Sequence, residues 1–355
     1  MPASVRLRRI RRLLIERKLD ALLITHPANI SYLTDYASRD SWLLVMPGKT
    51  FYFTDSRYTT EAKNLLSRAI TVRRAREGLI RALCLELKER KLKRVGFEER
   101  YLSFAWYAKV RDTAPGNLRL IPSGGMVEQL RQVKDEGELK KIRRAVAITG
   151  SALRRIKRYL KPGITELEVA GELERIIRCE GASASSFEII VASGPNGSLP
   201  HHIPSKRKLR AHEAVTVDIG VVFQGYRSDL TRTFFLGTIK PLIKEVYSIV
   251  REAQERVFSL LKPGCTANAL DAAARGYIKD KGYGAYFSHN LGHGVGVEVH
   301  EAPFLSGKSS ARMEPGMVLT VEPGIYLPNK FGIRIEDMLL VTQKGCDILS
   351  GAIDK

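Results

Sequence analysis

No run of apolar residues in the sequence approaches the roughly 20 that are needed to cross a bilayer, so we expect no membrane anchor. Only four of the 355 residues are cysteines, and no two of them form a CxxC pair. This scarcity excludes a disulfide-rich framework and favours free thiols in a reducing cytoplasm. The basic N-terminal segment lacks the apolar core and cleavage site of a signal peptide, so we interpret it as the first helix, with a transit peptide as the alternative.

Acidic residues are scarce in the first half of the chain. The sequence has 58 Lys and Arg against 38 Asp and Glu, a net charge of +20, and residues 1–160 alone carry +19. Such an asymmetry suggests an anionic partner such as nucleic acid or a ribosome. We favour a solvated basic surface, because the basic residues are spread over several predicted elements without interleaved aromatic residues.

The length of the chain predicts two domains. Predicted strands and helices alternate up to residue 121, which is typical of a mixed sheet covered by helices. This part contains neither a glycine-rich phosphate loop nor a cluster of acids and histidines. A Pro-Ser-Gly-Gly stretch then precedes a long predicted helix. We therefore predict an α/β N-terminal domain over residues 1–124 and a second domain over residues 125–355.

The second domain contains an internal repeat. Two Lys-Pro-Gly segments, at residues 161–163 and 262–264, each separate two predicted helices and are offset by 101 residues. A threonine follows each segment, Thr165 and Thr266, and we expect both to cap the next helix. Two acidic hairpins, described next, are offset by about 105 residues, so a duplicated unit of two helices plus strands is the simplest account.

Two acids flank the predicted turn of the first hairpin. β-Branched and aromatic runs on either side of Phe223, Gln224 and Gly225 predict this hairpin. Asp218 and Asp229 are equidistant from a turn centred between residues 223 and 224, so we expect them to face each other about 5 Å apart. Carboxylates in that position repel each other unless a positive charge lies between them.

A second acidic pair lies in the other copy of the repeat. Glu322 and Glu336 are equidistant from Asn329 in a turn-like segment, and His293 lies between the two hairpins in the sequence. Four carboxylates and one imidazole suit two divalent cations such as Mn²⁺, Co²⁺ or Zn²⁺. We therefore predict that acids from both copies meet around one dinuclear metal site.

These residues resemble a known family. The five predicted ligands, together with the strings Asp-Leu-Thr-Arg-Thr, Gly-His-Gly-Val-Gly-x-x-x-His-Glu and Glu-Pro-Gly-Ile-Tyr, look like the signature of the creatinase and methionine-aminopeptidase superfamily. Within it they are similar to the Xaa-Pro branch, aminopeptidase P and prolidase. The resemblance implies an α+β fold. Its pita-bread catalytic domain would have pseudo-twofold duplicated helices and antiparallel strands, preceded by a smaller creatinase-type α/β domain.

The resemblance also implies how the cations are held. Asp218 would bind one metal, Asp229 and Glu336 would bridge two, and His293 and Glu322 would complete the site at the other. Ligands of this kind accept Mn²⁺, which we expect most, as well as Co²⁺, Zn²⁺ or Fe²⁺.

The resemblance assigns further roles around the metal site. Glu322 would also shuttle a proton, and His300 would donate to the tetrahedral intermediate. His201 matches the substrate-side histidine of the family and His289 a second one, both expected to contact substrate. Arg334 would orient carboxylates and contact substrate. We expect the residue after His201, also a histidine, to face solvent, although the two are exchangeable in this assignment.

The implied activity is hydrolysis of the peptide bond between an N-terminal residue and a following proline. An aminopeptidase P-like preference is favoured, because Phe304 occupies the place where prolidase relatives often carry an arginine. A strict Xaa-Pro dipeptidase stays open, since an arginine of a partner's N-terminal domain can substitute. The resemblance also implies a homodimer. The alternatives are a creatinase-like hydrolase and a nucleic-acid- or ribosome-binding protein that uses the basic N-terminal domain.

Overall fold

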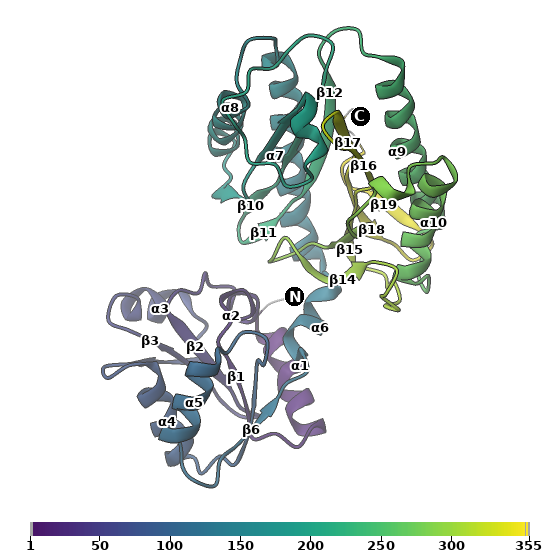
Figure 1. The fold of residues 1–355 in the computed structure, drawn as a ribbon. Helices are drawn as coiled ribbons and strands as arrows, with labels where there is room; N and C mark the ends of the chain where they lie inside the picture. The colour runs from purple at the N-terminus through teal and green to yellow at the C-terminus, as the bar shows by residue number, and fades with distance from the viewer. Residues whose placement is uncertain (1–2, 352, 354–355) are drawn as a thin grey trace. The chain divides into compact units, whose positions relative to one another are not determined.

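The computed structural model describes residues 3–351 and residue 353. It divides into two compact units, Met1–Arg131 and Gln132–Lys355 (Figure 1). None of the described helices is long and apolar enough to span a membrane.

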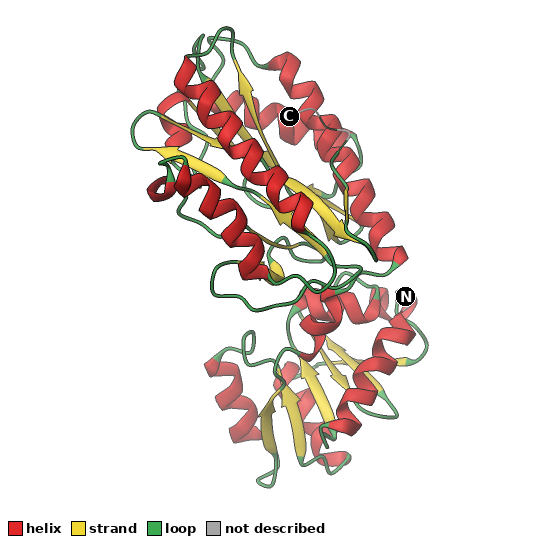
Figure 2. Cartoon of the chain, turned by 90° about the vertical axis from the view of Figure 1, so that its right-hand side faces the viewer, coloured by secondary structure: helices red, strands yellow, loops and turns green. Residues whose placement is uncertain are grey.

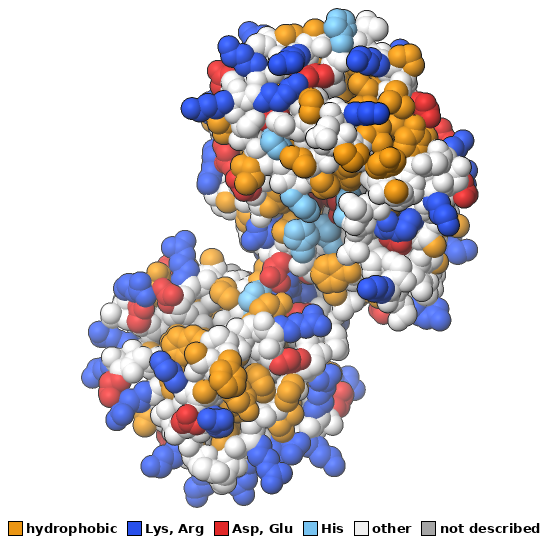
Figure 3. All heavy atoms as spheres, in the orientation of Figure 1, with side chains coloured by type: hydrophobic (Ala, Val, Ile, Leu, Met, Phe, Trp, Pro, Cys, Tyr) orange, Lys and Arg blue, Asp and Glu red, His pale blue; other side chains and the backbone are white. Residues whose placement is uncertain are grey.

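The first unit is a six-stranded sheet flanked by helices. Its strands lie in the order β4 (Ile70–Arg74), β3 (Thr50–Thr54), β2 (Ser41–Val45), β1 (Ala21–Ile24), β5 (Arg94–Phe97) and β6 (Arg119–Pro122). Strand β2 is antiparallel to both of its neighbours, and the other pairs are parallel, so the sheet is mixed as predicted. Its helices are α1 (Ala3–Glu16), α2 (Pro27–Thr34), α3 (Thr59–Leu65), α4 (Leu79–Glu89), α5 (Phe104–Thr113) and α6 (Met126–Gln132). Figure 3 shows Lys and Arg scattered over this unit on the face in view.

Helix α6 falls mainly in the first unit, whereas the predicted boundary at residue 124 assigned it to the second. The physical reason is a buried polar network. Arg131 Nη1 donates to Asn29 Oδ1 at 2.7 Å, and Asn29 Nδ2 donates to Glu128 Oε1 at 2.6 Å. These hydrogen bonds connect α6 to α2, and the local sequence pattern does not predict them.

The second unit contains two helix pairs, and each pair precedes the strands of its copy: α7 (Glu136–Tyr159) with α8 (Glu166–Cys179), and α9 (Pro241–Leu260) with α10 (Ala267–Asp280). The last residues of α7 and α9 are 101 residues apart, and so are the last residues of α8 and α10, which is the offset of the Lys-Pro-Gly segments. Figures 1 and 2 show strands between the pairs. Two apolar cores follow the division, one under α7 and α8 and one under α9 and α10. The predicted duplication is therefore visible in three dimensions.

The strands of the second unit are all antiparallel to their described partners. The first copy contributes β7 (Ala184–Ser185), β8 (Ile190–Ser193), β9 (Ala214–Ile219), β10 (Val221–Phe223), β11 (Tyr226–Arg227) and β12 (Leu230–Phe235). The second contributes β13 (Gly292–Gly294), β14 (Glu301–Leu305), β15 (Val318–Val321), β16 (Gly324–Leu327), β17 (Phe331–Arg334), β18 (Asp337–Val341) and β19 (Cys346–Ile348). The sheet orders are β11-β10-β7, β12-β9-β8, β14-β13-β15-β18-β19 and β16-β17.

The two repeats cap their helices differently. Thr165 begins α8 with a capping box, accepting from Glu168 N at 3.1 Å. Thr266 occupies the same place before α10 but makes no such hydrogen bond, and its hydroxyl donates to Asn268 instead. The prediction of a capping threonine is therefore right for the first copy and wrong for the second.

The turn of the first acidic hairpin is centred one residue later than predicted, which shifts the strand register by two residues. Its turn consists of Gln224 and Gly225, with φ of 48° and 80°, the two positive values of a tight hairpin turn. Asp218 consequently faces Thr231 rather than Asp229. Asp229 lies diagonally across from Asp218 on the same face, still within reach.

The second acidic hairpin has the predicted register. Val321 pairs with Asp337 on one side of the acidic pair, and Gly324 pairs with Arg334 on the other. Glu322 and Glu336, between these pairs, therefore face each other across Asn329.

Candidate active site

The predicted site residues come together around one cavity of about 410 Å³ in the second unit. All nine line it: Asp218, Asp229, His293, Glu322 and Glu336, with His201, His289, His300 and Arg334. A group of histidine side chains reaches the surface on the face of this unit shown in Figure 3.

The four predicted acidic ligands lie next to strand ends, and the predicted histidine ligand lies within a short strand. Asp218 is near the end of β9, Asp229 precedes β12, and His293 is in β13. Glu322 directly follows β15, and Glu336 directly precedes β18. The two hairpins of the duplicated unit thus deliver one acidic pair each, and β13 adds the imidazole.

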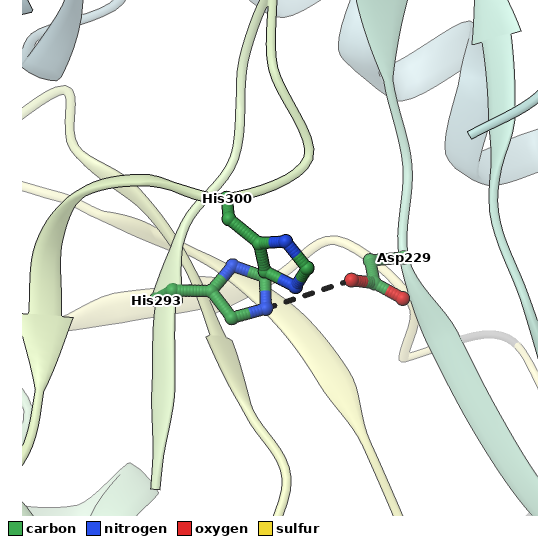
Figure 4. A group of neighbouring side chains, drawn as sticks. All are labelled: Asp229, His293 and His300. Atoms are coloured by element: carbon green, nitrogen blue, oxygen red, sulfur yellow. Dashed lines mark ion pairs between the residues drawn. The ribbon is translucent and has the colours of Figure 1, made fainter. Parts of the chain in front are cut away.

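The ligand atoms form overlapping groups. Oxygens of Asp218, Asp229 and Glu336 lie within 4.8 Å of one another, as do atoms of His293, Glu322 and Glu336. Glu336 belongs to both groups. A third group joins Asp229 and His293 with His300, whose ring centroid lies 4.4 Å from that of His293 (Figure 4).

The charges of these buried acids are not balanced by the protein. Asp229 and Glu336 are 4% and 1% exposed. Burial and the charge of Asp218 raise the pKa of Asp229 well above its ordinary value, and burial and Asp229 do the same to the pKa of Glu336. Burial raises the pKa of Glu322 to about 8. Carboxyl groups in such a place must hold protons or bind cations.

The donor atoms fit divalent cations. Asp218 Oδ1 is buried and has no hydrogen-bond partner among the described residues, so it is a free acceptor in the cavity wall. Burial lowers the pKa of His293 to about 4, so its imidazole is neutral. Its Nδ1 lies 3.1 Å from the carbonyl oxygen of Gly294, which places the proton there. Nε2 is then a free ligand atom, 3.6 Å from Asp229 Oδ2 and 3.5 Å from Glu322 Oε1.

Arg334 and Thr231 hold the carboxylates in place. Arg334 is buried, and its Nη2 donates to Asp218 Oδ2 at 2.7 Å, as the predicted orienting role requires. Thr231 donates to Glu336 Oε2 at 2.8 Å and accepts from Arg334 Nε at 3.1 Å. The sequence analysis did not single out Thr231, although its place opposite Asp218 in the correct register identifies it.

His201 and His202 differ in environment. His201 is exposed on the cavity wall. His202 is partly buried, and its Nε2 lies 2.8 Å from Oε2 of the fully buried Glu166. The expectation that His202 faces solvent is wrong, because Glu166 at the start of α8 needs polar partners in its buried place.

His289 and His300 differ in their hydrogen bonds and in their exposure. His289 Nε2 lies 2.8 Å from the hydroxyl of Tyr326, which in turn accepts from Arg334 Nη1 at 2.9 Å. Burial lowers the pKa of His289 to about 4, so its ring is neutral near pH 7. His300 is exposed at the cavity, and partial burial lowers its pKa. Its ring therefore faces the space that a substrate would fill.

Two copies of one α+β unit that gather buried acids and a neutral imidazole in a single cavity define a metallopeptidase with the pita-bread fold. Comparison with known families agrees. The model of metallopeptidase family M24 matches residues 140–343, and that of the creatinase/prolidase N-terminal domain matches residues 6–133. The chain therefore belongs to metallopeptidase family M24, and its family implies the use of divalent metal ions.

Individual relatives resemble the chain over nearly its whole length. An uncharacterized peptidase of Bacillus subtilis, YqhT, is 39% identical over 341 residues, 96% of each chain. The structure of an Xaa-Pro dipeptidase from Bacillus anthracis is 36% identical, with a TM-score of 0.95 over 99% of both chains. An X-Pro aminopeptidase from Thermotoga maritima is 37% identical, with a TM-score of 0.91 over 97% of both.

Proposed function

We propose that this metallopeptidase is an Xaa-Pro peptidase that releases the N-terminal residue before a proline and holds two divalent cations, Mn²⁺ first among them. The observation that carries the proposal is the convergence of four carboxylates and a neutral imidazole in one cavity. The similar structures from B. anthracis and T. maritima, whose names state Xaa-Pro activities, support the substrate class. Bound cations would lower the pKa of water and oppose the charge that develops on the scissile carbonyl oxygen.

The protein's own groups supply proton transfer and positioning. Glu322 lines the cavity beside His293, where its carboxylate can accept a proton from water and pass it to the leaving proline nitrogen. His300, exposed at the same cavity, donates to the carbonyl oxygen as negative charge builds there. Arg334 keeps Asp218 in place through its 2.7 Å contact. His201 lies on the wall where substrate enters.

A proline in the second position suits this cavity. Its tertiary amide has no N–H, so it needs no acceptor from the wall. Ile203 and Phe304 line the cavity and are 64% and 42% exposed, which offers apolar surface to the pyrrolidine ring and to the residues after it. Ligand cavities are typically lined by apolar surface of this kind.

We propose further that peptides longer than two residues are preferred. A dipeptide carries its C-terminal carboxylate directly on the proline, and a strict dipeptidase needs a cation for it. Arg334 is the only Lys or Arg among the described residues that line the cavity. Its guanidinium is already engaged by Asp218, Tyr326, Thr231 and the carbonyl of Pro200.

The test uses protein stripped by a chelator and reloaded with Mn²⁺. We expect release of alanine from Ala-Pro-Phe and more slowly from Ala-Pro, but not from Ala-Ala-Phe. Chelated protein and Asp229→Asn should be inactive, whereas Asp280→Asn, an exposed acid at the end of α10, should retain activity. No release of alanine from either proline peptide by protein with two bound cations would refute the proposal.

A further inference from the structure

The cavity contains one carboxylate that belongs to no metal-ligand group. Glu188 lines the cavity and is exposed, and it lies outside all three groups of clustered ligand atoms. The Glu188 carboxylate forms no hydrogen bond or ion pair with another described residue. A charged group in this position is available to a ligand.

An irregularity in the sheet places Glu188 there. Ser185 pairs with Val221, and Ile190 pairs with Asp218. Four residues therefore separate the two pairs on the β7–β8 side, against two on the β9–β10 side. The excess residues form a bulge, which is a common way to aim side chains at an active site. Phe187 and Glu188 both lie in this bulge and both line the cavity.

The neighbours of Glu188 indicate which charged group it meets. Ile190, only 8% exposed, lies across from Asp218 at the floor of the site, and Glu188 lies two residues, at most about 7 Å of chain, further out. The α-ammonium of a substrate is only two bonds from the scissile carbonyl carbon, so it stays near Asp218 at the floor of the site. A long basic side chain on the same residue extends outward, and it has an apolar stem and a cationic head. Phe187 offers a ring to the stem and Glu188 a charge to the head.

We infer that Glu188 selects peptides whose N-terminal residue is arginine or lysine. This inference depends on the proposed function, since it concerns the same cavity. The acidic side of the cavity, from Asp218 outward to Glu188, receives the N-terminal residue with its positive charge. Other lining residues, among them His289, His300 and Phe304, offer imidazole and apolar surface that suits the carbonyl and the proline. Glu188 is a specificity residue and takes no part in bond cleavage.

The test compares two isosteric peptides, Arg-Pro-Ala and citrulline-Pro-Ala, with the Mn²⁺-loaded enzyme. We expect kcat/KM to be about 1.5- to 5-fold higher for the arginine peptide, the size expected for one partly exposed ion pair. Glu188→Gln should bring the ratio to about one and leave cleavage of the citrulline peptide within about twofold of wild type. Glu188→Lys should invert the ratio, and added salt should reduce it in wild type.

Two results would overturn the inference. One is the same ratio in wild type and Glu188→Gln. The other is a Glu188-dependent preference for arginine in the third position, tested with Ala-Pro-Arg against Ala-Pro-citrulline, in place of the first. Cleavage of the citrulline peptide is the internal control for the proposed function, because its absence in wild type refutes that function independently of Glu188.

Discussion

Replacing Glu322 by glutamine should stabilise the metal-free protein. Removing a carboxylate that is paired with a positive charge would instead destabilise it. Burial raises the pKa of Glu322 from 4.5 to about 8 when no cation is present. The folded protein then holds a proton that the unfolded chain has lost, so stability falls as the pH rises from about 4.5 to about 8. At about 1.4 kcal/mol per pH unit, the cost reaches about 3 kcal/mol at pH 7.

Glutamine removes this cost because it carries no charge at any pH. We expect metal-free Glu322→Gln to unfold with up to about 3 kcal/mol more free energy than wild type at pH 7, and with no advantage at pH 4.5. Mn²⁺ should reverse the order, since a ligand at about 100 times its Kd adds about 2.7 kcal/mol to the form that binds it. Glu314→Gln, an exposed acid before β15, is the matched control and should change little at either pH.

The readout must report on the second unit. Trp42 and Trp106, the two tryptophans of the chain, both lie in the first unit, so their fluorescence follows the wrong transition. Amide hydrogen exchange in β15 and β18, measured in denaturant between pH 4.5 and 8 and corrected for intrinsic exchange, follows the site itself. A metal-free Glu322→Gln that is less stable than wild type by the same amount throughout this range would refute the reasoning.

Four further substitutions test the surroundings of the site. Thr231→Val removes the hydrogen bond to Glu336, so Mn²⁺ affinity should fall about 10-fold by titration calorimetry, with the fold retained. His202→Ala should cost about 1–3 kcal/mol in denaturation because it leaves a buried carboxylate short of a partner, whereas His201→Ala should lower kcat and spare stability. Lys134 Nζ and Glu301 Oε1 form a buried ion pair of 2.7 Å. Lys134→Met breaks this pair and should lower the free energy of unfolding by about 3–5 kcal/mol. Unchanged stability would contradict the pairing.

Much of the fold follows from local patterns in the sequence. The mixed sheet, the duplicated helices and the facing of Glu322 and Glu336 were all predictable, because side-chain periodicity and the Lys-Pro-Gly repeat are local signals. The register of the first hairpin was not, since the choice of Gln224 and Gly225 as the turn depends on which residues take positive φ. The resulting two-residue shift changes the partner of Asp218 from Asp229 to Thr231 but leaves both acids on the same face.

The parts of the site that escaped prediction depend on tertiary packing. Glu166 is distant in sequence from His202, yet it is the buried partner that makes His202 structural. Glu188 enters the cavity through a bulge that only the pairing on either side of it reveals. Helix α6 belongs to the first unit because of Asn29, about 100 residues earlier in the chain. None of these contacts can be predicted from the periodicity of apolar residues or from the spacing of motifs in the sequence.

The most direct test of the whole account is a count of Mn²⁺ bound per chain at equilibrium, made by calorimetry with elemental analysis on wild type and Asp229→Asn. We predict two ions per wild-type chain and a loss of tight binding in the variant, because Asp229 belongs to both the carboxylate group and the histidine group. Equal binding by the two proteins, or no tight binding by wild type, would contradict the claim that these residues form one metal centre.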